Sequence, residues 1–104
     1  MVAEKIHTKQ DLLEALFLYS ATIKSYGVKS LGIFGSFSKE SNTELSDVDL
    51  YVDFDLDKKS FDNFMDLSFF LEGILGRKVE IVTPQSLSKF IGPHILKEVQ
   101  YVSL

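Results

Sequence analysis

The stretch GSFSKESNTELSDVDLYV, residues 35–52, contains the features that decide the expected fold. It begins with a glycine after an apolar run and ends in a segment where every second residue is apolar. That alternation is typical of a β-strand with one buried face, here Val48, Leu50, Val52 and Phe54. The opposite face carries Asp47, Asp49, Tyr51, Asp53 and Asp55. Aspartate is among the residues least suited to strands, so the acidic face requires an explanation.

The rest of the chain predicts helices and strands in alternation around this stretch. The expected elements are a helix near 9–26, a strand at 28–34, a helical turn near 36–40, the acidic strand at 47–55, a helix at 61–75, a strand at 77–83 and a helix at 93–102. Thr8 and Ser60 are suited to cap two of the helices, and Gly27 and Gly76 to end them. We expect an α/β (α+β) fold, with a small mixed sheet of about three strands and helices mainly on one face.

Composition limits the class of protein. A length of 104 residues fits one domain, residues 1–104, and 45% hydrophobic residues suffice for a core. The formal charge of −4 argues against direct nucleic-acid binding, for which a basic surface is expected. There is no cysteine, hence no disulfide and no thiolate metal site. Neither a signal sequence nor an apolar run of about 20 residues is present, so we expect a soluble cytoplasmic protein without a membrane segment.

Three acidic residues are candidates for a metal site. Asp47 and Asp49 lie at i and i+2 of a strand, so their side chains share one face about 7 Å apart along the chain. Oxygen ligands in this arrangement suit a hard divalent cation such as Mg²⁺. Glu80 interrupts the apolar strand KVEIV and could supply a third carboxylate from a neighbouring strand. The alternative is a solvated strand face, with Glu80 paired to Arg77 or Lys78.

The solvated alternative is the favoured interpretation for Asp53, Asp55 and Asp57, which run from the strand into a loop.

Gly35 and Ser36, at a strand-to-helix turn, could bind a phosphate, because glycine permits close approach of the backbone and serine adds a hydroxyl. Lys39, one turn later, could reach a phosphate oxygen. Each feature alone is also typical of an ordinary turn or a surface lysine.

Together, these residues form a pattern. Gly35 and Ser36, ten intervening residues, the pair Asp47 and Asp49, and a later acid at Glu80 resemble the signature of the minimal nucleotidyltransferases of the DNA polymerase β superfamily. The resemblance extends over nearly the whole chain, including the segment ILKEVQYV near its end.

Three positions depart from the usual signature. Lys39 stands where the family usually has arginine, and Glu40 where glycine often follows it. Glu80 replaces an acid that is commonly aspartate. Lysine offers a point charge to a phosphate rather than the planar fork of arginine.

The resemblance implies a reaction: transfer of a nucleoside monophosphate, with AMP from ATP as the expected case, to a hydroxyl group with release of pyrophosphate. It implies that Asp47 and Asp49 hold two Mg²⁺ ions and that Glu80 holds the metal on the acceptor side and helps to deprotonate the hydroxyl. The Gly-Ser pair would bind the phosphates, with Lys39 offsetting their charge.

The resemblance also implies a partner. Minimal nucleotidyltransferases are often antitoxins paired with a HEPN-type toxin, to which they transfer AMP on a tyrosine. We expect this activity here, because a chain of this length leaves no room for a domain that binds the acceptor. Two alternatives stay open: an inactive antitoxin that neutralises its partner by contact, and a nucleotidyltransferase acting on a small molecule such as an aminoglycoside. The sequence also leaves a homodimer or a heteromer open.

Overall fold

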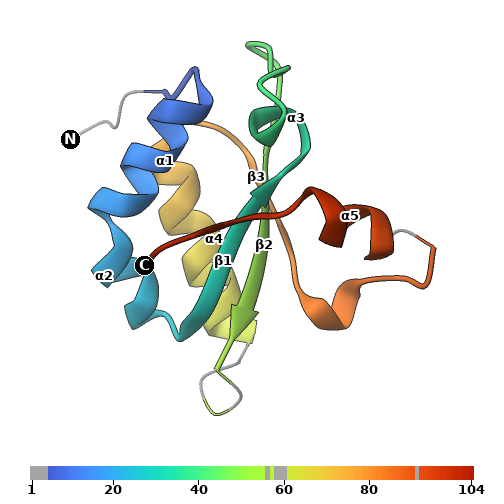
Figure 1. The fold of residues 1–104 in the computed structure, drawn as a ribbon. Helices are drawn as coiled ribbons and strands as arrows, with labels where there is room; N and C mark the ends of the chain where they lie inside the picture. Colours follow the sequence, from blue (N-terminus) through green and yellow to red (C-terminus); the bar gives the residue numbers. More distant parts are fainter. Residues whose placement is uncertain (1–4, 56, 58–60, 91) are drawn as a thin grey trace.

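A four-stranded sheet forms the centre of the fold in the computed structural model, which describes residues 5–55, 57, 61–90 and 92–104 (Figure 1). The elements are α1 (Lys9–Leu18), α2 (Ser20–Ser25), β1 (Val28–Phe34), α3 (Gly35–Ser38), β2 (Val48–Phe54), α4 (Phe61–Leu75), β3 (Val79–Val82), the 3-10 helix η1 (Pro84–Ser86), α5 (Gly92–Glu98) and β4 (Gln100–Val102). The strands lie in the order β3-β2-β1-β4. β1 is antiparallel to β2 and β4, whereas β2 and β3 are parallel, so the predicted mixed sheet is confirmed.

Helices α1, α2 and α4 cover one face of the sheet (Figure 1). The fully buried side chains between these helices and the strands are Leu12, Leu16, Ile23, Leu31, Ile33, Val48, Leu50, Val52, Leu67, Leu71 and Leu75. The alternation predicted for the acidic strand is therefore confirmed, because its apolar face lies in this core. No helix in the described ranges is long and apolar enough to span a membrane.

The predicted helix ends depend on local side-chain and backbone chemistry. Thr8 caps α1 in a capping box with Asp11: Asp11 N donates to Thr8 Oγ1 (3.0 Å) and Thr8 N donates to Asp11 Oδ2 (3.2 Å). Gly27 (φ 89°) and Gly76 (φ 66°) follow the last turns of α2 and α4, in a left-handed conformation that glycine adopts without strain. The cap predicted at Ser60 lies outside the described residues.

Two predictions about the elements were wrong. The helix expected at 93–102 ends at Glu98, and residues 100–102 form β4 instead, which adds a fourth strand to the expected three. The helix expected at 9–26 is divided at Tyr19 into α1 and α2. In α1, Leu12 and Leu16 are buried, whereas Phe17 is 73% exposed.

Part of the second face of the sheet is also covered. Tyr51 of β2, on the same face as Asp49, is only 7% exposed and makes an edge contact with Tyr101 of β4 (ring centroids 6.4 Å apart). Gly32 of β1 pairs with both tyrosines. A Cβ atom at Gly32 would overlap the side chain of Val99, so this glycine allows the chain to enter β4 close to the sheet.

Candidate active site

The parallel pairing of β2 with β3 brings Asp49 and Glu80 together. The two residues are register partners, so their side chains emerge side by side on the same face of the sheet. Asp49 is partly buried and Glu80 is exposed. Burial raises the pKa of Asp49 from 3.8 to about 6, and the charges of Glu80 and Asp47 and a hydrogen bond with Glu80 act in the same direction. The ionised form of Asp49 is therefore costly in the protein alone.

Asp47 lies just before β2 and is exposed. Its charge reaches Asp49 strongly enough to raise the pKa of that residue, so the three predicted acids act on one another electrostatically. Within the described ranges, however, no three acidic or histidine side chains already have the spacing of an assembled metal site. The structure thus places Asp49 and Glu80 as neighbours and leaves Asp47 at the edge of the pair.

Gly35 lies directly against Asp49. The glycine follows β1, has φ 74°, and begins the short helix α3. A Cβ atom at this position would overlap Asp49 Oδ2. Both the backbone conformation and the close approach of the carboxylate therefore require glycine. Ser36, the next residue, is partly buried, and its carbonyl accepts a hydrogen bond from Ser41 N (2.9 Å).

Lys39 at the end of α3 forms an ion pair with Glu98 of α5, with 2.9 Å between Nζ and Oε1. The Lys39 side chain is 59% exposed, so the pair is a surface interaction, worth at most about 1 kcal/mol. Glu40, the next residue, has φ 59°, a conformation that residues other than glycine and asparagine rarely adopt. Glycine at position 40 would therefore fit this conformation without strain.

Comparison with known proteins identifies the family of this chain. Residues 19–102, which include all the predicted site residues, match the nucleotidyltransferase domain family. The chain belongs to this family.

Several relatives of this nucleotidyltransferase are known. It is 40% identical over 77 residues to the protein adenylyltransferase MntA of Thermococcus cleftensis, an alignment that covers 74% of this chain and 77% of the relative. A solved structure of a candidate minimal nucleotidyltransferase superposes with a TM-score of 0.81 at 25% identity, covering 93% of this chain and 98% of that one. A chain of a toxin–antitoxin complex with AMP-PNP superposes with a TM-score of 0.65 at 18% identity, covering 91% and 72%, which shows the shared fold alone.

Arg77 is a residue of this nucleotidyltransferase that the sequence did not indicate as important. The sequence offered Arg77 as a partner of Glu80, but the side chain is 6% exposed and is directed elsewhere. Its Nε donates to Ile6 O (2.8 Å), and its Nη1 donates to Thr43 O (3.0 Å) and Ser46 O (2.9 Å). Nη2 has no hydrogen-bond partner in the part of the chain that the structure describes, a cost of about 1–3 kcal/mol.

No local pattern could have revealed these contacts. The carbonyl groups that Arg77 binds lie 31 to 71 residues away in the sequence, on segments without apolar periodicity. The only signal was an arginine next to a glycine turn and a strand, which is common on protein surfaces.

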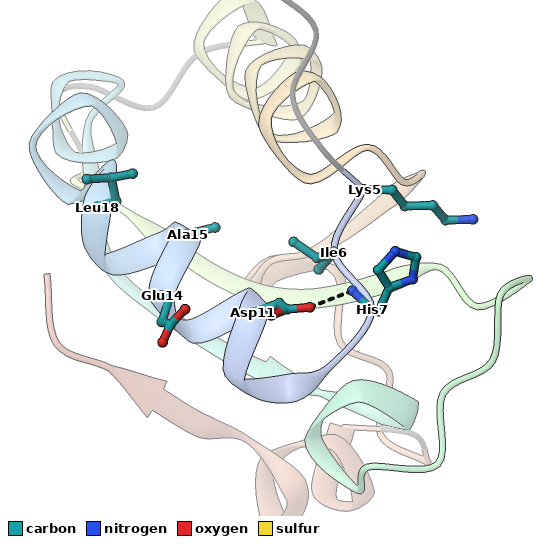
Figure 2. Close-up of a pocket in the computed structure, with 7 residues that line it drawn as sticks. All are labelled: Lys5, Ile6, His7, Asp11, Glu14, Ala15 and Leu18. Carbon is teal, nitrogen blue, oxygen red and sulfur yellow. Dashed lines mark hydrogen bonds between the residues drawn. The ribbon is translucent and has the colours of Figure 1, made fainter.

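Two of the surface hollows formed by the described residues differ in their relation to the predicted site. One, shown in Figure 2, lies along α1 and is lined by Lys5, Ile6, His7, Asp11, Glu14, Ala15 and Leu18. The Asp11 carboxylate in it accepts hydrogen bonds from the backbone of His7 (3.0 Å) and Thr8, which lower its pKa, so its function is to cap the helix. The other lies beside Glu80, where Val82, Leu87 and Ile95 add apolar walls. The second hollow therefore adjoins the predicted site, and the first does not.

Proposed function

We propose that this nucleotidyltransferase transfers AMP from ATP, in the presence of Mg²⁺, to a hydroxyl group on a HEPN-type toxin and thereby acts as its antitoxin. The observation that carries the proposal is the pairing of Asp49 with Glu80 against Gly35, in a chain of this family. Two carboxylates held together beside a glycine at a strand-to-helix turn suit a nucleotidyl transfer site.

The names of related proteins support a protein of the HEPN type as the acceptor. The Thermococcus cleftensis relative is named a protein adenylyltransferase. One structural neighbour is a complex of a tri-AMPylated HEPN toxin of Shewanella oneidensis with its MNT antitoxin, at 18% identity and a TM-score of 0.60.

The acidic residues suit Mg²⁺ in their chemistry. Asp47, Asp49 and Glu80 offer only carboxylate oxygens, the ligands that Mg²⁺ prefers, and two of them are adjacent. Burial is the main cause of the raised pKa of Asp49, and the like charges of Glu80 and Asp47, which a cation would neutralise, raise it further. When bound, Mg²⁺ would supply charge stabilisation for the phosphates and lower the pKa of the attacking hydroxyl. Asp47 and Asp49 would hold both ions, and Glu80 would join them at the ion on the acceptor side.

The other predicted residues would bind the triphosphate. Gly35 would let a phosphate approach the backbone at the start of α3, and Ser36 would contribute a hydroxyl donor. Lys39 would exchange Glu98 for a phosphate oxygen, since the exposed ion pair is weak enough to open. The protein thereby brings donors to the triphosphate from α3 and acids from the two strands.

The reaction would proceed by displacement at phosphorus. The acceptor oxygen forms a bond to the α-phosphorus, the bond from that phosphorus to the oxygen bridging to the β-phosphate breaks, and pyrophosphate leaves. Glu80, which is exposed, would take the proton of the acceptor hydroxyl and pass it to solvent. The hollow beside Glu80, with Val82 and Ile95 in its walls, is suited to receive the acceptor side chain.

Transfer of label tests the proposal. The purified protein is incubated with the HEPN partner, Mg²⁺ and ATP labelled at the α-phosphate. We expect label on a partner tyrosine, and we expect Asp47→Asn and Asp49→Asn each to reduce the rate by a factor of about 10² or more, as for removal of a group that stabilises charge in the transition state. Asp53→Asn, on the same strand face but away from Glu80, serves as the control and should retain activity.

Two outcomes would overturn the proposal. Neutralisation of the partner without label, unaffected by Asp47→Asn and Asp49→Asn, would establish an antitoxin that acts by contact alone. Label on an aminoglycoside or another small molecule, in the absence of any partner protein, would establish a different acceptor.

A further inference from the structure

Arg77 contacts or adjoins each of the three segments that carry the predicted site. Its guanidinium carbon lies 5.0 Å from the centre of the Phe37 ring, in the helix that begins with Gly35 and Ser36. Its Nη1 binds the carbonyl of Ser46, the residue directly before Asp47. Arg77 itself lies two residues before β3, which carries Glu80.

The loop 42–46 leads into Asp47 and is held by polar contacts. Leu45 at its tip is 94% exposed, so this side chain does not anchor the loop in the core. Nη1 of Arg77 lies within hydrogen-bonding distance of the carbonyls of Thr43 (3.0 Å), Glu44 (3.4 Å) and Ser46 (2.9 Å). Asn42 Nδ2 also donates to His7 O (2.7 Å), and Lys5 Nζ donates to Glu44 O (3.0 Å). Arg77 is the buried anchor among these, whereas Lys5 and Glu44 are at the surface.

We propose that Arg77 is a positioning residue for nucleotidyl transfer: it fixes the loop 42–46, and through it the Asp47 carboxylate, relative to the Gly-Ser turn and Glu80. The inference rests on the proposed function of Asp47 and Asp49 as metal ligands. In this proposal the buried guanidinium of Arg77 aligns Asp47 with the two acids that the sheet already pairs.

The chemistry of the contacts supports a geometric role. All the hydrogen-bond acceptors that the structure gives for Arg77 are backbone carbonyls, so the side chain recognises where the backbone lies. The planar fork of arginine binds Ile6 O through Nε and the loop through Nη1 at the same time. Lysine keeps the charge but concentrates its donors at one atom, so it cannot reproduce both contacts. Arg77→Lys therefore removes the geometry while keeping the charge.

Binding of Mn²⁺, followed by electron paramagnetic resonance in the absence of nucleotide and partner, tests the inference without relying on catalysis. We expect Arg77→Lys to weaken Mn²⁺ binding by about tenfold or more, as is typical when a residue that orients a metal ligand is replaced. In the transfer assay, added Mg²⁺ should restore part of its rate, with little change in the KM for ATP. Leu71→Ala, which opens a cavity in the core beneath α4, is the control for lost stability and should bind Mn²⁺ as the wild type does.

A second variant keeps the test decisive if circular dichroism shows that Arg77→Lys does not fold. Asn42→Ala removes another polar anchor of the loop and should also weaken Mn²⁺ binding. Wild-type binding by a folded Arg77→Lys, or by Asn42→Ala where it replaces Arg77→Lys, would overturn the inference and leave the proposed function standing. Equal weakening by Leu71→Ala would overturn it as well. A wild-type protein that transfers no label and binds no Mn²⁺ would overturn both.

Discussion

Replacing Asp49 with asparagine should stabilise the protein at neutral pH while removing its activity. Raising the pKa of Asp49 from 3.8 to about 6 corresponds to about 3 kcal/mol of unfavourable free energy for the ionised side chain. Because the side chain is only partly buried, solvent screening lowers the expected effect to about 1.5–3 kcal/mol. Asparagine has the same shape, so it preserves the close contact with Gly35 without the charge.

The direction of the stability change follows from how the protonation of Asp49 depends on pH. Below about pH 4, Asp49 is protonated in the folded and unfolded states, and the penalty is absent. Between about pH 4 and 6 the folded state retains a proton that the unfolded state has lost, so the free energy of unfolding of the wild type should decrease as the pH rises. Above about pH 6 the penalty is complete. Asp49→Asn should lack this decrease.

Urea denaturation in EDTA at pH 4 and at pH 7.5 measures the effect. At pH 7.5 we expect Asp49→Asn to exceed the wild type by about 1.5–3 kcal/mol, and at pH 4 the two should agree to within about 0.5 kcal/mol. Asp53→Asn, which removes a charge from the same face of the strand, should change stability by no more than about 0.5 kcal/mol. Added Mg²⁺ should stabilise the wild type and not Asp49→Asn. Equal stability of Asp49→Asn and wild type at pH 7.5 would refute the reasoning.

Three further substitutions test the surroundings of the site. Gly35→Ala should lower the free energy of unfolding by about 2 kcal/mol or more, because φ 74° and the overlap with Asp49 both oppose a Cβ atom. A loss under about 0.5 kcal/mol in urea denaturation would contradict this expectation. Glu40→Gly should raise stability by about 1 kcal/mol by relieving φ 59°, whereas a loss in the same assay would show that the strain is absent. Glu98→Gln should change stability by less than about 1 kcal/mol, and it should lower the KM for ATP because Lys39 is then free to bind a phosphate. An unchanged or higher KM would contradict phosphate binding by Lys39.

Much of the fold was predictable because its signals are local. The alternation along β2, the capping box at Thr8 and the glycine after α4 each depend on residues within one turn or one strand, and each was confirmed. The pairing of Asp49 with Glu80 required one long-range assumption, that β2 and β3 are neighbours on a sheet. The parallel register of these strands satisfied it.

The features that could not be predicted depend on contacts between distant segments. Ile95, Leu96, Val99 and Val102 repeat with a helical period, so nothing local distinguishes β4 from a continuing helix. The strand forms because β1 offers an open edge, and because Gly32 leaves room for Val99. The buried position of Arg77 likewise depends on carbonyls from two other segments of the chain.

The contact between Gly35 and Asp49 also constrains the order in which this site could change during evolution. While Asp49 is present, a side chain at position 35 would overlap its carboxylate and force it to move, so a change at position 35 is costly before one at position 49. A lineage that lost catalysis through a smaller residue at position 49 would remove the collision but not the backbone requirement of φ 74°. Position 35 would then admit asparagine sooner than a β-branched residue, because asparagine tolerates the left-handed region. The residues found at positions 35 and 49 would thus show that the change at position 49 came before the change at position 35.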